Sequence, residues 1–191
     1  MENKQTSTAP QALGMSTIKN IVFDFGGVLI DWNPRYFFRS YFNDDERMEY
    51  FLSPEWNEKQ DAGRSIAEAV AEAKSLHPEF SEAIDCYYDH FPDCLGGCIE
   101  KNVARLKQYK RKGYRLYGLT NWPAETFHYA LELLDGIVVS GIEKVKKPDP
   151  RFYQILLSRY GLKAEECLFL DDREENLAAA QKLGFHVEHI I

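Results

Sequence analysis

The sequence predicts an α/β fold: a parallel sheet with helices on both faces and a small all-helical cap inserted after the first strand. Residues 18–29 form an apolar run, which is typical of a central strand covered on both sides. Residues 33–92 contain helix-like segments only. From residue 99 onward, helix-like and strand-like segments alternate, which indicates right-handed crossovers and parallel strands.

Each element follows from local patterning and from turn residues. Strands are expected at 18–29, 115–119, 137–140, 167–170 and 186–190. Helices are expected at 99–112, 124–134, 150–160 and 175–183, and Gly113 is a usual helix stop. Four short helical pieces are expected in the cap, at 34–42, 44–52, 65–77 and 79–91. The predicted domains are a disordered tail (1–17), a core (18–32 and 96–191) and a helical cap (33–95).

The composition is that of a globular protein, with 45% hydrophobic and 28% charged residues. A net charge of −7 argues against nucleic-acid binding through phosphate neutralisation. We find no apolar run of the roughly 18 residues that would span a bilayer and no secretory leader, so we expect a cytoplasmic protein without a membrane partner. The four cysteines form neither a zinc nor a disulfide pattern, and no signal indicates the oligomeric state.

Chemically active side chains follow the predicted strands, at the ends where a parallel sheet binds ligands. These strand ends are at residues 24–27, 120–121, 146–148 and 171–172. Taken singly, each has an ordinary interpretation: Asp24 could start a turn, Lys147 could be a solvated lysine, and Asp171 and Asp172 could cap a helix. Their joint placement at neighbouring strand ends favours a common site.

The combination fits transfer of a phosphoryl group to an aspartate. Asp24 is the expected nucleophile, which divides a difficult hydrolysis into two easier steps. The carboxylates suit a hard cation such as Mg²⁺, which would mask their charge from a phosphate dianion. Lys147 and Thr120 would hold the phosphoryl oxygens, and the glycines after Asp24 would let backbone amides approach the anion.

These segments carry a resemblance to the haloacid dehalogenase-like (HAD) hydrolase superfamily, whose members are mostly phosphatases. IVFDFGGVL, YGLTN, KKP and LFLDDREEN resemble its four motifs, in order, and the likeness covers residue 18 to the end. IVFDFGGVLIDW, VKKPDPRFYQ and FLDDREENLAAAQKLG are similar to bacterial sugar-phosphate phosphatases of the glucose-1-phosphatase group. The resemblance implies a Rossmann-like core, Mg²⁺ as cofactor and a cap that sets substrate choice.

The resemblance also implies roles for individual residues. The catalytic residues are Asp24, Lys147 and Thr120; the substrate-binding residues are Phe25, Gly26, Asn121 and Lys147; the metal ligands are Asp24, the Gly26 backbone carbonyl, Asp171 and Asp172. The segment 53–64 is the expected substrate-facing loop.

The chain departs from the common pattern at Gly26. In most of these phosphatases, this position is occupied by a second aspartate, which serves as general acid and base. In this chain a glycine stands there, so no side chain at this position can transfer a proton. General acid–base catalysis contributes roughly 10² to 10⁴-fold. We therefore expect faster hydrolysis of anomeric or aryl phosphates than of alkyl phosphates. Asp31 is an alternative acid, although a turn-capping or flap-fixing role is favoured for it.

The predicted function is that of a Mg²⁺-dependent phosphatase acting on a small phosphorylated metabolite, with a sugar phosphate as one candidate. Two alternatives stay open. A haloacid dehalogenase also uses the first aspartate and lacks the second, but it has little use for Asp171 and Asp172. A weakly catalytic phospho-ligand-binding protein would keep the site without turnover.

Overall fold

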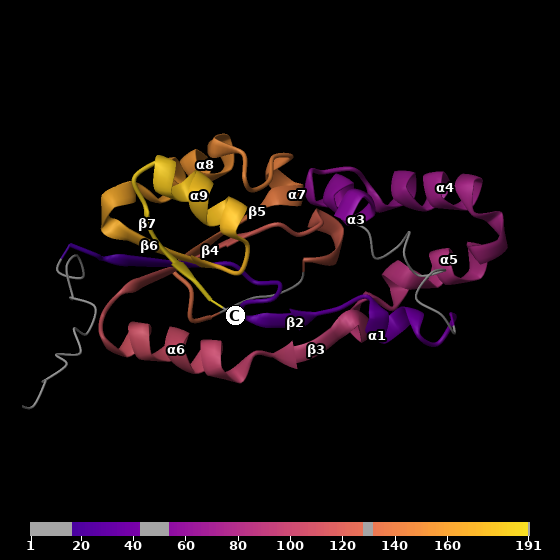
Figure 1. The fold of residues 1–191 in the computed structure, drawn as a ribbon, viewed down its shortest axis with the longest axis horizontal. Helices are drawn as coiled ribbons and strands as arrows, with labels where there is room; N and C mark the ends of the chain where they lie inside the picture. The colour runs from indigo at the N-terminus through magenta and orange to yellow at the C-terminus, as the bar shows by residue number, and fades with distance from the viewer. Residues whose placement is uncertain (1–16, 43–53, 128–131, 191) are drawn as a thin grey trace, which may run out of the picture.

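The structure is a computed structural model that describes residues 17–42, 54–127 and 132–190 (Figure 1). Its centre is a five-stranded parallel sheet in the order β5-β4-β1-β6-β7. The strands are β1 (Asn20–Phe23), β4 (Arg115–Thr120), β5 (Gly136–Val139), β6 (Cys167–Asp171) and β7 (His186–His189). The predicted α/β fold class is confirmed.

Strand β1 is the middle strand, and every one of its residues is buried. It pairs with β4 on one side and β6 on the other, so that Ile21 lies opposite both Leu116 and Leu168. The strand ends at Phe23, whereas the sequence predicted a continuous strand over 18–29. The chain turns after Asp24 because the Phe25 carbonyl accepts hydrogen bonds from three later amides, those of Val28, Leu29 and Ile30.

Helices cover both faces of this sheet (Figure 1). Helix α6 (Glu100–Arg111) packs Leu106 and Tyr109 into the hydrophobic cluster that contains Ile21 and Phe23. Helices α8 (Pro150–Tyr160) and α9 (Glu174–Lys182) lie on the opposite face, in the cluster that contains Val22. The alternation along β1 therefore assigns successive side chains to two separate cores.

Helix α8 shows how closely local signals can define an element. Asp149 caps its N-terminus by accepting a hydrogen bond from the Arg151 amide, and Pro150 occupies the first turn. Gly161 ends the helix with a left-handed φ of 62°. The observed bounds are those that the sequence predicted.

A second unit of the chain lies to one side of the sheet (Figure 1). It begins after β2 (Ile30–Trp32) and ends at β3 (Leu95–Cys98), two antiparallel strands that the sequence did not indicate as a pair. Between them lie α1 (Arg35–Phe38), α3 (Pro54–Asp61), α4 (Ile66–Leu76), α5 (Ser81–Asp89) and the 3₁₀ turns Pro78–Phe80 and Phe91–Cys94. We propose this helical segment as the cap, with the predicted boundaries 33–95.

Other predictions differ from the structure or fall outside its described part. The expected helix 124–134 begins as a 3₁₀ turn (Ala124–Thr126), and residues 128–131 are outside the described residues. The same holds for the expected helix 44–52 and for nearly all of the predicted tail. Helix α7 (Ser140–Glu143) and the 3₁₀ turn Ala164–Glu166 were not predicted. Every helix in the described ranges is too short or too polar to traverse a membrane.

Candidate active site

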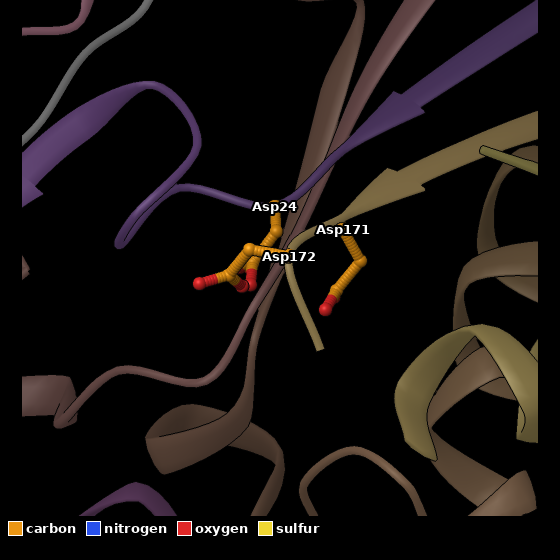
Figure 2. Close-up of side chains that lie close together, drawn as sticks. All are labelled: Asp24, Asp171 and Asp172. Atoms are coloured by element: carbon orange, nitrogen blue, oxygen red, sulfur yellow. The ribbon is translucent and has the colours of Figure 1, made fainter. Parts of the chain in front are cut away.

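The predicted catalytic side chains meet at the carboxyl ends of the central strands. Asp24 follows β1, Thr120 is the last residue of β4, and Asp171 is the last residue of β6. Because β1 lies between β4 and β6, the parallel topology brings these three ends together. Figure 2 shows Asp24, Asp171 and Asp172 gathered at the ends of β1 and β6.

Lys147 joins the acids into one cluster. Its ammonium lies 2.8 Å from Asp24 Oδ1 and 2.7 Å from Asp171 Oδ2, and its side chain is completely buried. Asp171 is completely buried as well, whereas the side chain of Asp24 is 10% exposed. The lysine is therefore part of the site and not a solvated surface residue.

Burial and mutual interactions shift the pKa values of this cluster. Burial raises the pKa of Asp24 to about 7; Lys147 opposes the shift and Asp171 adds to it. Burial by itself would lower the pKa of Lys147, but the two carboxylates outweigh it and raise its pKa. Burial, followed by Asp171, also raises the pKa of Asp172. Three carboxyl groups around one ammonium thus leave an excess of negative charge that favours a further cation.

The three acids are close enough to share a metal ion. One oxygen atom from each of Asp24, Asp171 and Asp172 lies within 4.8 Å of the others. No hydrogen bond within the described residues uses the Gly26 carbonyl, so this oxygen is available as a further ligand. An all-oxygen set of this kind suits Mg²⁺. Asp171 has less freedom than the other two, because its oxygens accept hydrogen bonds from Lys147, the Arg173 amide and Asn176.

Gly27 permits the close approach of Asp172 to the turn after β1. Its φ is +75°, in the left-handed region, and a Cβ atom placed there would lie 2.5 Å from Asp172 Oδ2. A side chain at this position would push the carboxylate out of the acid cluster.

Asn121 holds the lysine in place. Its side-chain oxygen accepts a hydrogen bond from the Lys147 amide at 2.8 Å, and its side-chain nitrogen donates to the Lys147 carbonyl at 3.0 Å. Thr120 is fully buried beside it. The structure therefore uses the Asn121 amide to position Lys147, while the substrate contact predicted for it stays a proposal.

Phe25 and Gly26 occupy the turn between β1 and β2. The Phe25 ring is fully buried and packs against Phe127, and its amide donates to Asp24 Oδ1 at 2.7 Å. A substrate contact through the Phe25 side chain is thus not available in this structure. Gly26 lines the site, and a Cβ atom there would meet only Trp122, at an ordinary 3.8 Å.

The site comprises two adjoining compartments. The polar compartment, of about 240 Å³, is lined by Asp24, Gly26, Gly27, Trp32, Asp61, Asn121, Asp172, Arg173 and Asn176. The aromatic compartment, of about 60 Å³, is lined by Gly26, Trp32, Asn57, Asp61, Tyr88, Phe91, Asn121, Trp122 and Pro123. Asp24 and Asp172 line only the polar compartment, and the aromatic compartment adjoins it at about a quarter of its volume.

Two lining residues come from helix α3, where the sequence predicted a substrate-facing loop. Asn57 and Asp61 are four residues apart, which places them on the same helix face. Most of the segment 53–64 is therefore a helix and not a loop, and its contact with a substrate stays a prediction. Asp61 itself was missed; the only signal was this helical spacing in a segment interpreted as a loop.

Several other candidates are not part of the site. Asp31 lines neither compartment; its carboxylate accepts a hydrogen bond from the Tyr36 hydroxyl at 2.8 Å and lies against Gly96. The four cysteines are free. No histidine lines either compartment among the described residues.

A parallel α/β core with an aspartate, a lysine and an acidic pair at its strand ends defines a class of hydrolase, and comparison with known proteins gives the same class. The haloacid dehalogenase-like hydrolase family matches residues 18–184. The chain belongs to this family and is a hydrolase.

The chain is also similar to individual proteins of known activity or known structure. The chain is 30% identical to sesquiterpene phosphatase astK of Aspergillus oryzae, covering 92% of this chain and 91% of the relative. It is 25% identical to phosphoglycolate phosphatase of Vibrio cholerae, covering 89% and 83%. Among solved structures, the magnesium complex of the HAD family enzyme bt-2542 from Bacteroides thetaiotaomicron has a TM-score of 0.71 at 20% identity, covering 91% and 93%. This likeness shows the shared fold.

Proposed function

We propose that the protein is a Mg²⁺-dependent phosphatase that hydrolyses a small phosphorylated metabolite through an aspartyl-phosphate intermediate on Asp24. The supporting observation is the buried Lys147 ammonium, held between Asp24 and Asp171 beside the carboxylate of Asp172. Two of the relatives are, by their names, phosphatases.

In the first step the Asp24 carboxylate attacks phosphorus and the bond to the leaving oxygen breaks. Lys147 stabilises the charge on the phosphoryl oxygens, with the Thr120 hydroxyl as a further donor. Water then releases phosphate from Asp24 in the second step. Asp24, Asp171, Asp172 and the Gly26 carbonyl would hold Mg²⁺, which supplies positive charge against the carboxylates and the phosphate.

The acidic pair supports a phosphatase over a haloacid dehalogenase. A dehalogenase uses an aspartate nucleophile on a neutral carbon and needs no cation to mask it. Two further carboxylates within 4.8 Å of that aspartate would then repel its charge without any benefit. A phosphatase gains from them because they bind the metal that offsets the negative charge of its substrate.

The aromatic compartment supports an apolar or aromatic leaving group over a sugar. Four of its nine lining residues are aromatic: Trp32, Tyr88, Phe91 and Trp122. Of its polar side chains, Asn121 is already bonded to the Lys147 backbone, and the Tyr88 hydroxyl accepts a hydrogen bond from Gln60. The sesquiterpene phosphatase among the relatives acts, by its name, on an apolar compound of this kind.

The experiment is a comparison of terpenyl, aryl, sugar and simple alkyl phosphates, each with Mg²⁺ and with EDTA. We expect release of phosphate with Mg²⁺ only, fastest for the apolar and aryl esters, and its loss in Asp24→Asn. Chloride release from 2-chloropropionate in EDTA would identify a dehalogenase instead. Tight phosphate binding without turnover of any ester would identify a binding protein.

A further inference from the structure

Asp61 lies where the polar and aromatic compartments meet. Four residues line both compartments: Gly26, Trp32, Asp61 and Asn121. Asp61 is the only one of these four with an ionisable side chain. In a phosphate ester whose phosphoryl group occupies the polar compartment and whose organic group occupies the aromatic one, the oxygen that joins them lies at this boundary.

The other ionisable groups of the two compartments have properties that do not suit proton transfer to that oxygen. Asp24 is the nucleophile and Asp172 belongs to the metal cluster. Burial raises the pKa of Tyr88 far above neutrality, and its hydroxyl accepts a hydrogen bond from Gln60. Arg173 is held in ion pairs with Glu58 and Glu175.

We propose that Asp61, supplied by helix α3 of the helical segment, is the general acid and base of the hydrolysis and replaces the aspartate absent at Gly26. This proposal rests on the proposed phosphatase function. Under this proposal, the inserted helical segment contributes a catalytic group as well as selecting the substrate.

Asp61 alone can supply and take up the proton that the two steps require. When Asp24 attacks phosphorus, the electron pair of the breaking P–O bond goes to the leaving oxygen, and the Asp61 carboxyl gives that oxygen its proton. The alcohol or phenol departs, and Asp61 is left as a carboxylate. In the second step, this carboxylate takes a proton from the water that attacks phosphorus. Phosphate and the Asp24 carboxylate are released, and Asp61 is protonated again.

The surroundings of Asp61 suit this exchange. Burial raises its pKa to about 7, opposed by Lys146 and, more weakly, by Lys147 and Arg173, and supported by Glu58. The Asp61 carboxylate forms no hydrogen bond or ion pair within the part of the chain that the structure describes. An acid with a pKa near the working pH has both protonation states populated, as general acid–base catalysis requires.

Helix α3 is fixed on the core next to this residue. Glu58, one helical turn before Asp61, forms ion pairs with Lys146 at 3.1 Å and with Arg173 at 3.5 Å. Lys146 precedes the catalytic lysine, and Arg173 follows the acidic pair, so these contacts tie the position of α3 to the catalytic cluster.

The test measures how the rate depends on the acidity of the leaving group. Asp61→Asn should lower kcat/KM by about 10² to 10⁴-fold for alkyl phosphates, whose leaving oxygen needs a proton. It should change the first step of p-nitrophenyl phosphate cleavage far less, because that leaving group is stable as an anion. The variant should also lose the limb of the pH–rate profile that titrates with Asp61.

Two further variants make the result specific. Asp85→Asn removes an exposed carboxylate of the same helical segment that pairs with Lys74 outside both compartments, and it should leave all rates unchanged. Gly26→Asp, combined with Asp61→Asn, should restore alkyl phosphate cleavage in part, since a Cβ atom at position 26 meets only an ordinary contact.

The outcomes separate this proposal from the proposed function. An active wild type that loses activity in Asp24→Asn, together with an Asp61→Asn variant whose rates fall equally for all leaving groups or not at all, would overturn the role of Asp61 alone. A wild type that hydrolyses no phosphate ester with Mg²⁺ would overturn both.

Discussion

The ammonium of Lys147 lies 2.7 Å from a carboxylate oxygen of Asp171, and neither side chain is accessible to solvent. Breaking a buried ion pair by removing one partner typically costs 3–5 kcal/mol, because the remaining charge stays buried without compensation. Lys147→Met should therefore lower the free energy of unfolding by about that amount in EDTA and abolish hydrolysis. Urea denaturation and the ester assay measure the two effects.

The matched control for this prediction is Lys74→Met. Lys74 forms an ion pair of the same 2.7 Å length with Asp85, but both side chains are substantially exposed. Exposed pairs contribute only about 0–1 kcal/mol. Equal stability losses in the two variants would contradict the importance of burial at Lys147.

Gly27→Ala should weaken metal binding. The added methyl group would occupy the position of Asp172 Oδ2 and displace this carboxylate from the acid cluster. We expect a higher Mg²⁺ concentration for half-maximal activity and a smaller Mg²⁺-induced rise in Tm. Gly113→Ala is the control: this glycine also has a left-handed φ, +86°, but a Cβ atom there meets nothing within 4 Å. An unchanged Mg²⁺ requirement in Gly27→Ala would contradict the role of Asp172 as a ligand.

Asp61→Asn should change how stability depends on pH. The pKa of Asp61 is raised in the folded protein from 3.8 to about 7, so between these values the folded state holds a proton that the unfolded state has released. Stability therefore falls as the pH rises from about 4 to 7, by up to about 1.4 kcal/mol per pH unit for this one group.

The asparagine variant lacks this contribution. Relative to wild type, it should gain stability steadily over the same pH window, as measured by urea unfolding at pH 4.5 and 7. Asp85→Asn, which removes an exposed carboxylate, should follow the wild-type profile. Parallel profiles for wild type and Asp61→Asn would show that the carboxyl is not perturbed.

Glu58→Gln should loosen helix α3. The substitution removes the charge that pairs with Lys146 and Arg173 while it keeps the side-chain shape. Since the pairs are partly exposed, we expect an effect of about 1 kcal/mol, or up to about fivefold in kcat/KM for alkyl phosphates. Faster hydrogen exchange of the α3 amides should accompany it. Asp85→Asn removes a carboxylate that pairs with Lys74, between α4 and α5 and with no residue of α3, and it should alter neither measurement.

Local sequence signals were sufficient to predict the bounds of an element where those bounds depend only on residues within the element. The helix 150–160 has a capping aspartate, a proline in its first turn and a glycine at its end, and all three act within the segment. The strands that carry Thr120 and Asp171 were predicted to within one residue because apolar runs define them. The same pattern failed at residues 24–29, where the apolar run continues but the Phe25 carbonyl gathers three amides into a turn.

The short strands β2 and β3 were missed for a related reason. Residues 95–98 read LGGC, with two glycines and little apolar character, and they form a strand only because Ile30 to Trp32 are placed beside them. Pairing across more than sixty intervening residues has no local signature.

The sequence by itself determined the class of fold, the family and the strand-end residues that form the cluster of acids around Lys147, since each follows from apolar periodicity and from short motifs. Only the tertiary structure decided that Asn121 holds Lys147, that Gly27 makes room for Asp172, and that Asp61 lines the same two compartments as Gly26. The physical reason is that these residues are far apart in the chain and are brought together by the packing of strands, helices and loops, and the spacing of residues along the sequence does not encode the distances between them.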